Sequence, residues 1–271
     1  MRWWQVLAGG TGIVALVAPQ LSAAQPTGHA VAVVQQSLLS PAGAVRQPLG
    51  EGTPVSLGDV VQTGPSGEAQ LLFEDETRIV VGPNSSLLIE DALFPTEGTA
   101  ERFAINALGG TFRFISGQSA SSAYSIRTPT ATIGVRGTIV EFAYDGTSRA
   151  THVVGLEGTV QFCARSVFDL KLEGECAEVT GPCTVMTATP GGEIIEYTEQ
   201  EKREVIKREF PYIPSQAGLL SPFRADTSAC PVFAFIDPTR ALGLAGLGLA
   251  AGLIINEVSK DDGPPPVPVS P

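Results

Sequence analysis

The stretch EAQLLFEDETRIVVGPNSSLLIE, residues 68–90, decides the fold class. Within it, Ala69, Leu71 and Phe73 would lie on one face of an extended chain, and Gln70 would lie on the other. Alternation with a period of two is typical of a β-strand that is buried on one face. The sequence therefore predicts that Leu71 and Phe73 are buried and that Gln70 is exposed to solvent.

The turns around this stretch extend the pattern along the chain. The residues GPN at 82–84 are turn formers, and the acids Glu74, Asp75 and Glu76 are expected at a solvated hairpin tip. Downstream, the segments RFAINAL, TFRFI, YSI, TIVEFAY, THVV and TVQF each read as a strand, with breaks expected at or near Gly109, Gly117, Gly137, Gly146 and Gly158. Many short strands at such spacing predict a compact, mainly β domain.

Composition agrees with short strands and narrows the class of partner. The chain of 271 residues contains 30 glycines and 21 prolines, more than ordinary usage. Its formal net charge is −11, and it has no Lys and Arg cluster that could follow a phosphate backbone. Nucleic acid is therefore excluded as a partner, and an anionic membrane surface is disfavoured.

The N-terminus has the pattern of a secretory signal peptide. Arg2 precedes an apolar run that ends in small residues, with Ser22 and Ala24 at the −3 and −1 positions of a cleavage site. We expect residues 1–24 to be removed, although an uncleaved anchor remains an alternative. The expected location is the periplasm or cell envelope, with membrane association as a further option.

Export makes the four cysteines informative, because thiols outside the cytoplasm usually form disulfides. No C-x-x-C pair occurs among them, so neither a zinc site nor a redox motif is predicted. Of the three possible connectivities we favour Cys163 with Cys176, joining neighbouring strands, and Cys183 with Cys230, holding a later segment against the domain.

The region after Cys163 changes character. Residues 164–192 read as a β extension, and residues 193–210 contain a charged helix from about 199 to 209, because Thr198 and Glu201 form a capping box. Residues 211–237 carry several prolines and are expected to form an extended, irregular linker.

The C-terminus is apolar and then proline-rich. Residues 238–257 form a hydrophobic segment, and 258–271 a disordered tail. Residues 241–256 are uncharged, rich in leucine and glycine, and shorter than the roughly 20 residues of a lone membrane span. We expect a hydrophobic helix that associates with a membrane or with copies of itself; the alternative is a buried element of the β domain.

Four strings in the central region carry a family resemblance: GDVVQTGPSGEAQLLFEDETRIVVGPNSSLLIE, GTFRF, YSIRTPTATIGVRGTIVEF and VVGLEGTVQF. In order and spacing they resemble a FecR domain over residues 58–163, preceded by lead-in strands at 25–57. The resemblance implies a mainly β fold of twisted, stacked strands, sandwich-like or solenoid-like, that binds or transmits and has no catalytic residues. It departs from the founding regulator, since a signal peptide leads almost directly into the domain, so direct control of a sigma factor is not expected.

Two arginines are candidate binding residues, Arg136 in the V-R-G-T string and Arg127 before the TP-x-A step. A guanidinium beside a glycine can hold a carboxylate through two hydrogen bonds. The alternative is a structural role, bonding turn carbonyls while Gly137 takes a positive φ. The same alternative applies to Arg113.

No constellation for catalysis is visible. The only histidines are His29 and His152, and no G-x-S-x-G elbow precedes a helix, so we expect a protein that is not an enzyme and uses no cofactor or metal. The first hypothesis is a cell-envelope binding or scaffold protein whose FecR-like domain recognises an envelope protein, peptide or glycan. The alternative is a periplasmic signal-transducing component acting on a separate membrane regulator.

Overall fold

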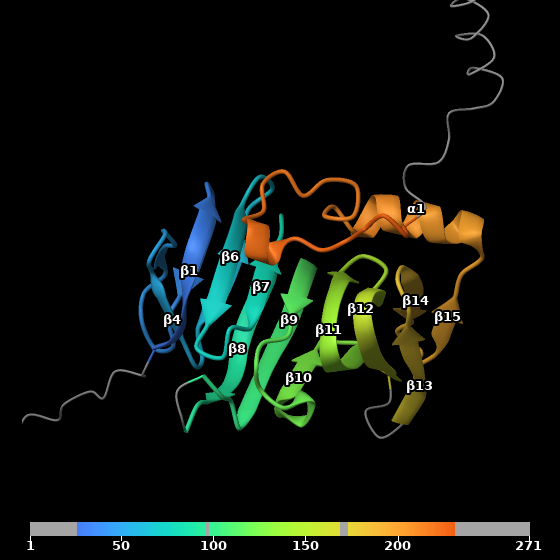
Figure 1. Cartoon of the computed structure of the whole chain (residues 1–271), viewed down its shortest axis with the longest axis horizontal. Helices are drawn as coiled ribbons and strands as arrows, with labels where there is room; N and C mark the ends of the chain where they lie inside the picture. Colours follow the sequence, from blue (N-terminus) through green and yellow to red (C-terminus); the bar gives the residue numbers. More distant parts are fainter. Residues whose placement is uncertain (1–25, 96–97, 169–172, 231–271) are drawn as a thin grey trace, which may run out of the picture.

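The computed structural model describes residues 26–95, 98–168 and 173–230 (Figure 1). The expected signal peptide at 1–24, hydrophobic segment at 238–257 with its helix at 241–256, and tail at 258–271 lie outside the described residues. Among the helices within the described ranges, none has the length and apolar character needed to cross a bilayer.

Fifteen strands, all hydrogen-bonded into one connected sheet, make up most of the described chain. Their bounds in chain order are β1 Pro26–Val34, β2 Ser37–Ser40, β3 Gln47–Pro48, β4 Pro54–Ser56, β5 Val60–Thr63, β6 Glu68–Phe73, β7 Arg78–Val81, β8 Ser86–Leu93, β9 Arg102–Ile115, β10 Tyr124–Arg127, β11 Ala131–Asp145, β12 Ala150–Arg165, β13 Glu173–Thr180, β14 Thr184–Ala188 and β15 Ile194–Glu196. The predicted mainly β class is confirmed. All pairings are antiparallel except that of β9 with β10, so the sheet is mixed.

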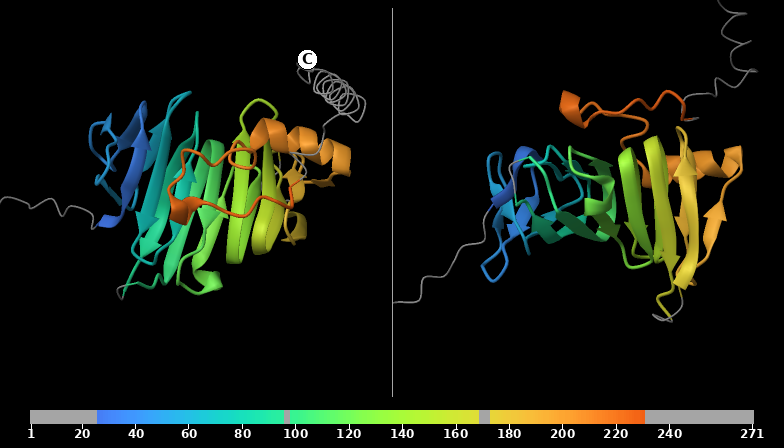
Figure 2. Two further views of the ribbon diagram at one scale, coloured as in Figure 1. Left: turned by 45° about the horizontal axis from the view of Figure 1, so that its top comes forward. Right: turned by 60° about the horizontal axis from the view of Figure 1, so that its bottom comes forward.

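The sheet folds into two layers because β9, β11 and β12 each exchange partners halfway along. The first half of β9 pairs with β8 and β10, whereas its second half pairs with β7 and β11. Likewise, one half of β12 pairs with β14 and the other with β13. We call the layer that contains β1, β6, β7 and β14 the strap layer, because residues 210–230 cross its outer face (Figure 2), and we call the layer that contains β5, β8, β10 and β13 the far layer.

Glycines sit where the long strands pass from one layer to the other. Gly137 in β11 and Gly158 in β12 have φ values of 58° and 75°, a conformation that other residues rarely adopt. A Cβ on Gly158 would lie 2.3 Å from the carbonyl oxygen of Gly137, so the two strands approach too closely for a side chain. The prediction of strand breaks at Gly109, Gly137 and Gly158 was therefore wrong: these glycines form bulges that bend continuous strands.

The core lies between the two layers and has the composition that the strand pattern predicted. Leu71 is fully buried and Phe73 is 3% exposed, and the ring of Phe73 meets that of Phe103 edge-on at 4.7 Å. Phe112 and Phe142 stack at 5.3 Å between neighbouring strands. The strand phase predicted for residues 69–73 is confirmed.

The chain after β15 returns across the strap layer (Figure 2). Helix α1, Glu199–Glu209, has the predicted bounds and the predicted capping box, in which the Glu201 amide donates to the Thr198 hydroxyl and the Thr198 amide donates to the Glu201 carboxylate. Residues 210–230, here called the strap, then cross the strands with a single short 3-10 turn, η2, at Ser221–Phe223. The segment expected as a linker is irregular, and up to Cys230 it lies on the domain, where it buries Phe210, Ile213, Leu219 and Phe223.

Candidate functional site

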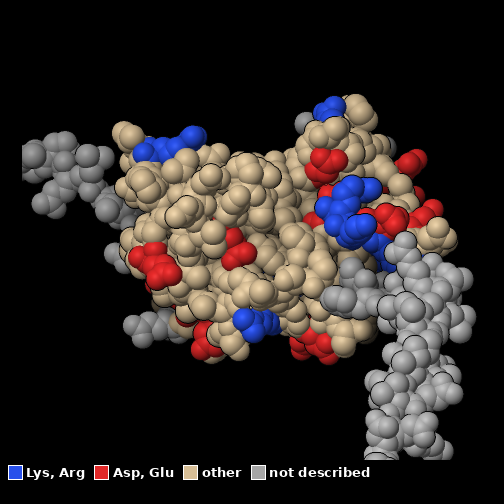
Figure 3. Space-filling view, turned by 90° about the horizontal axis from the view of Figure 1, so that it is seen from above, with Lys and Arg blue, Asp and Glu red and all other residues tan. Residues whose placement is uncertain are grey.

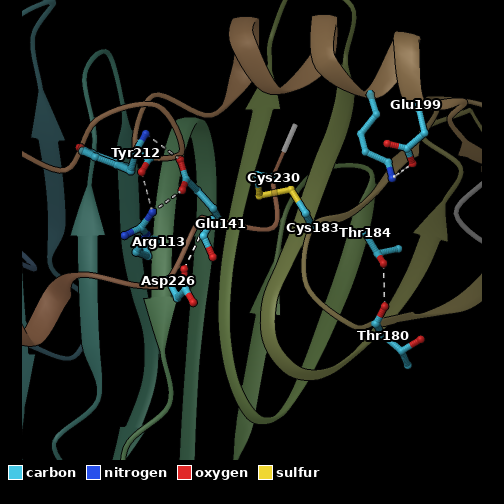
Figure 4. Close-up of a disulfide and its surroundings, with 11 residues drawn as sticks. Arg113, Glu141, Thr180, Cys183, Thr184, Glu199, Tyr212, Asp226 and Cys230 are labelled. Carbon is cyan, nitrogen blue, oxygen red and sulfur yellow. Dashed lines mark hydrogen bonds and ion pairs between the residues drawn. A yellow bond between two sulfur atoms is a disulfide. The ribbon is translucent and has the colours of Figure 1, made fainter. Parts of the chain in front are cut away.

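The strap is held by an ion pair on the outer face of the strap layer. Arg113 of β9 and Glu141 of β11 are directly opposite one another, and both side chains are fully buried. Arg113 Nη2 lies 2.9 Å from Glu141 Oε2 and donates to the carbonyl of Tyr212 at 3.0 Å (Figure 4). Arg113 Nη1 donates to the side chain of Gln216 and to the carbonyl of Phe223. One arginine thus joins two strands to three points of the strap.

Glu141 also bonds the strap directly, in addition to pairing with Arg113. Its Oε1 accepts a hydrogen bond from the Tyr212 backbone amide at 3.1 Å. Burial raises the pKa of Glu141, while Arg113 and the Tyr212 amide act in the opposite direction. The Tyr212 ring lies 5.6 Å from the guanidinium carbon, and its hydroxyl donates to Glu68 at 3.0 Å. Burial, followed by the Glu68 carboxylate, raises the pKa of the Tyr212 hydroxyl.

Gln70 faces the strap and not the solvent, so its predicted exposure was wrong. Its side chain is 1% exposed, donates to the Gly218 carbonyl at 3.0 Å, and accepts from the Leu220 amide at 2.9 Å. The side-chain amide of Gln70 therefore pairs with one backbone carbonyl and one backbone amide of the strap, as the backbone of a neighbouring strand would. The strand phase was correct, but both faces of this strand are covered.

Asp75 also departs from the prediction of a solvated hairpin tip. Its side chain is fully buried and accepts from the Ser119 hydroxyl at 2.6 Å, the Tyr124 hydroxyl at 2.7 Å and the Thr77 amide at 3.0 Å. Burial raises the pKa of the Tyr124 hydroxyl. The neighbouring acids Glu74 and Glu76 are exposed, as predicted. Asp75 joins the β6–β7 turn to the segment before β10 and is a structural residue.

The two candidate binding arginines lie on the surface and are not brought together. Arg127, at the end of β10, pairs with Glu90 at 2.9 Å, with side chains 45% and 33% exposed. Arg136 is exposed beside the β11 bulge, and its guanidinium makes no hydrogen bond or ion pair within the described residues. Gly137 has the positive φ expected of it. Binding by either arginine stays a prediction.

Both disulfides are present with the connectivity favoured from the sequence. Cys163 and Cys176 are opposite one another on β12 and β13. Cys183, directly before β14, bonds Cys230 at the end of the strap (Figure 4). Cys183 and Cys230 are 3% and 4% exposed, so the second bond is sealed inside the contact between sheet and strap. The strap is therefore anchored by α1 at one end, by a disulfide at the other, and by Arg113 between them.

A hollow of about 380 Å³ opens where the strap begins, over Ala143 of β11. We call it the Ala143 hollow; its lining includes Asn84, Thr111, Asp145, Arg208 and Glu209. Thr111, Ala143 and His152 occupy one row across β9, β11 and β12, so the small alanine side chain leaves space between two larger polar ones. Seen from above, Lys and Arg side chains gather together with acids over α1, and much of the strap surface is uncharged (Figure 3).

Two polar atoms in this row, one of them in the lining of the hollow, have unused bonding capacity. Thr111 Oγ1 and His152 Nε2 are buried and have no hydrogen-bond partner among the described residues. His152 Nδ1 lies 2.7 Å from the Thr187 hydroxyl, and Nε2 lies 3.9 Å from Glu209 Oε1. Burial lowers the pKa of His152, with the Glu209 carboxylate acting against it. At the rim, hydrogen bonds from the Ser148 hydroxyl and the Thr147 amide lower the pKa of Asp145 to about 2.

Sequence reasoning missed the strap cluster and the hollow, because both join segments far apart in the chain. One signal was available: Ile79, Val80 and Val81 are consecutive apolar residues, which indicates a strand covered on both faces. Val80 packs on Tyr212, Leu219 and Phe223 of the strap. No group of three or more His, Cys, Asp or Glu side chains suited to a metal ion occurs in the described part of the chain.

Comparison with known proteins identifies a domain within this chain. Residues 59–161 match the family model described as FecR protein, so the chain carries a FecR domain at the position that the motifs predicted. Two crystal structures of a proposed anti-sigma factor from Parabacteroides distasonis are similar at 15% identity, with TM-scores of 0.39 and 0.38. Each match covers 51% of this chain and 59% of the other, so the likeness spans less than two thirds of those neighbours. No curated protein sequence matches the chain.

Proposed function

We propose that this chain is a non-enzymatic recognition protein of the bacterial cell envelope, whose FecR domain binds a protein, peptide or glycan partner. The observation that carries the proposal is that the strap, residues 210–230, covers the outer face of the strap layer. Part of that layer lies within the FecR match at 59–161, and the strap follows it in the chain. A sheet sealed by a buried ion pair and a buried disulfide is a rigid platform. Rigid platforms suit recognition because little conformational entropy is lost when a partner binds.

The two disulfides support the proposed location. Four cysteines within the described residues are all oxidised, two of them joining adjacent strands and two closing the strap. Such bonds persist in oxidising compartments and are rare in the cytoplasm. The expected signal peptide at residues 1–24 supports the same location, and the leucine-rich residues 241–256 would keep the domain at a membrane or join copies of it.

A second candidate function is a periplasmic component of a signal-transduction pathway that acts on a separate membrane regulator. The FecR match favours it, since the family is named for a regulator. The two functions differ in their consequences: a signalling component alters transcription when it is deleted, whereas a scaffold alters the composition or integrity of the envelope. Transcript profiling of a deletion strain separates them.

The test of recognition is site-specific photo-crosslinking in the exporting cell. A photoreactive residue at Gly146, exposed at the rim of the Ala143 hollow, is compared with one at Val45, which is 86% exposed on the loop between β2 and β3. A Cβ at Gly146 meets no atom within 4 Å, so the substitution does not disturb the fold. We expect a defined envelope component at Gly146 only. Identical products from the two positions, or none from Gly146, would contradict recognition at this end of the domain.

Deleting residues 238–271 tests the proposed role of the apolar segment. We expect the truncated protein to leave the membrane fraction, or to become monomeric, with an unchanged melting temperature. Loss of the fold would instead show that these residues belong to the core of the domain.

A further inference from the structure

We propose that the Ala143 hollow binds a primary alkylammonium group, as carried by a lysine side chain or a short diamine. The inference rests on the proposed recognition function and names the chemistry that the FecR domain would recognise. Three features of the hollow support it: an unpartnered hydroxyl in its floor, an excess of carboxylate in its wall, and apolar surface beside both.

The floor supplies an acceptor that has no partner. Thr111 is 8% exposed, lines the hollow, and its Oγ1 makes no hydrogen bond within the described protein. A buried hydroxyl without a partner loses its hydration without compensation. The backbone of Thr111 is by contrast fully used, since its amide donates to the Ser85 hydroxyl at 2.9 Å and its carbonyl accepts from the Gly82 amide at 2.9 Å. A ligand donor at this position would satisfy the one remaining group.

The wall carries two carboxylates and one guanidinium. Arg208 donates to Glu209 Oε1, which leaves Glu209 Oε2 without a hydrogen bond in the described protein. Asp145 is held ionised by three donors on its two oxygens, and a carboxylate offers about four acceptor positions. Because Arg208 is matched by Glu209, the hollow has a formal excess of one negative charge. The whole chain, at −11, adds an attractive field for cations.

An ammonium group fits this set better than other ligand chemistries. It has three donors and no acceptor, and Thr111, Asp145 and Glu209 offer acceptor oxygens on one hollow. An anion would face two carboxylates, and Arg208, the cation in the described lining, is already paired with Glu209. Pro83, Ala143 and Pro211 line the same space and would contact the methylene stem that carries the charge.

The experiment is an NMR titration of the full exported chain with 1,5-diaminopentane and, separately, with a capped lysine peptide. The neutral 1,5-pentanediol and the dianion glutarate, of similar length, are the ligand controls. We expect saturable shifts at the amides of Gly110, Asp145 and Gly146 with both amines and none with the controls. Equal affinity for the two amines would show that the hollow recognises the ammonium group alone. Tighter binding of the peptide would show that the ligand is a lysine side chain of a protein.

Two variants complete the test. Thr111→Val keeps the shape of the side chain and removes the acceptor, and Glu209→Gln removes one charge; each should weaken diamine binding by about threefold to tenfold. Asp91→Asn, on the exposed part of β8 where Asp91 pairs with Arg102, should leave binding unchanged. Binding of pentanediol as tight as that of the diamine, absence of saturable shifts, or equal affinity in all variants would each overturn the ammonium site. The crosslinking result at Gly146 is independent of ligand chemistry, so recognition can hold if the ammonium site fails.

Discussion

Replacing Arg113 with methionine should destabilise the domain strongly, although the new side chain has a similar length and is apolar. The substitution leaves Glu141 buried without its countercharge and removes the donors to Tyr212, Gln216 and Phe223. Breaking a buried ion pair by removing one partner typically costs about 3–5 kcal/mol. We expect the free energy of unfolding to fall by that amount, and the strap to loosen before the sheet unfolds.

The companion change Glu141→Leu should cost a similar amount, because it leaves a buried guanidinium without its carboxylate. The double variant removes both charges, so its cost should be about 2–3 kcal/mol less than the sum of the two single costs. Gln216 retains its hydrogen bond from the Ala225 amide in every variant. In the double variant, the backbone groups that lose a hydrogen bond are therefore the carbonyls of Tyr212 and Phe223 and the amide of Tyr212.

The assay is equilibrium urea unfolding of oxidised protein, with the three variants and the wild type measured together. Arg127→Met is the matched control, because its ion pair with Glu90 is largely exposed and should contribute less than about 1 kcal/mol. Single variants that lose less than 1 kcal/mol, or a double variant whose cost equals the sum of the singles, would refute the assignment of Arg113 and Glu141 as the buried anchor of the strap.

Three further changes test the reasoning at separate points. Asp75→Asn should cost about 2–3 kcal/mol in urea unfolding, since three donors face a charged acceptor there, while the exposed Glu74→Gln should be nearly silent; equal effects would contradict burial of Asp75. Gln70→Asp should lower the melting temperature, because its amide donor to the strap is lost, although less than Leu71→Asp in the core; a silent Gln70 would place the strap elsewhere. Burial lowers the pKa of His152, so the neutral form stabilises the fold above the unfolded value of about 6.5, and that stability is lost as the pH falls from there toward the folded pKa. His152→Gln should flatten the fall in melting temperature between about pH 7 and 5, and unchanged slopes would show that another group titrates.

Local patterns in the sequence predicted much of the fold. The alternation around Leu71 gave the correct strand phase, because one face of a strand packs on a core whatever its neighbours are. Thr198 and Glu201 marked the start of α1 through bonds within a single turn. The cysteine pairing followed from which segments could be neighbours.

The sequence-based predictions that failed concern residues on the outer face of the strap layer, which the strap covers. Gln70, Arg113 and Glu141 have polar side chains at positions that alternate with core residues, and in an isolated hairpin they would face water. Their burial is caused by residues 70 to 150 positions later in the chain, which periodicity within a strand cannot register. Gly137 and Gly158 were misread for a related reason, since a glycine that bends a long strand and one that ends a short strand look alike.

Hydrogen exchange at the backbone amides of Tyr212 and Leu220 tests most sharply whether the strap is an integral layer of the β domain. These amides donate to the buried side chains of Glu141 and Gln70. We expect these two amides to exchange only with the global unfolding of the sheet, at rates close to that of the Phe114 amide in β9. Exchange as fast as that of the exposed Thr147 amide would show that residues 210–230 are a solvated linker and not a layer of the domain.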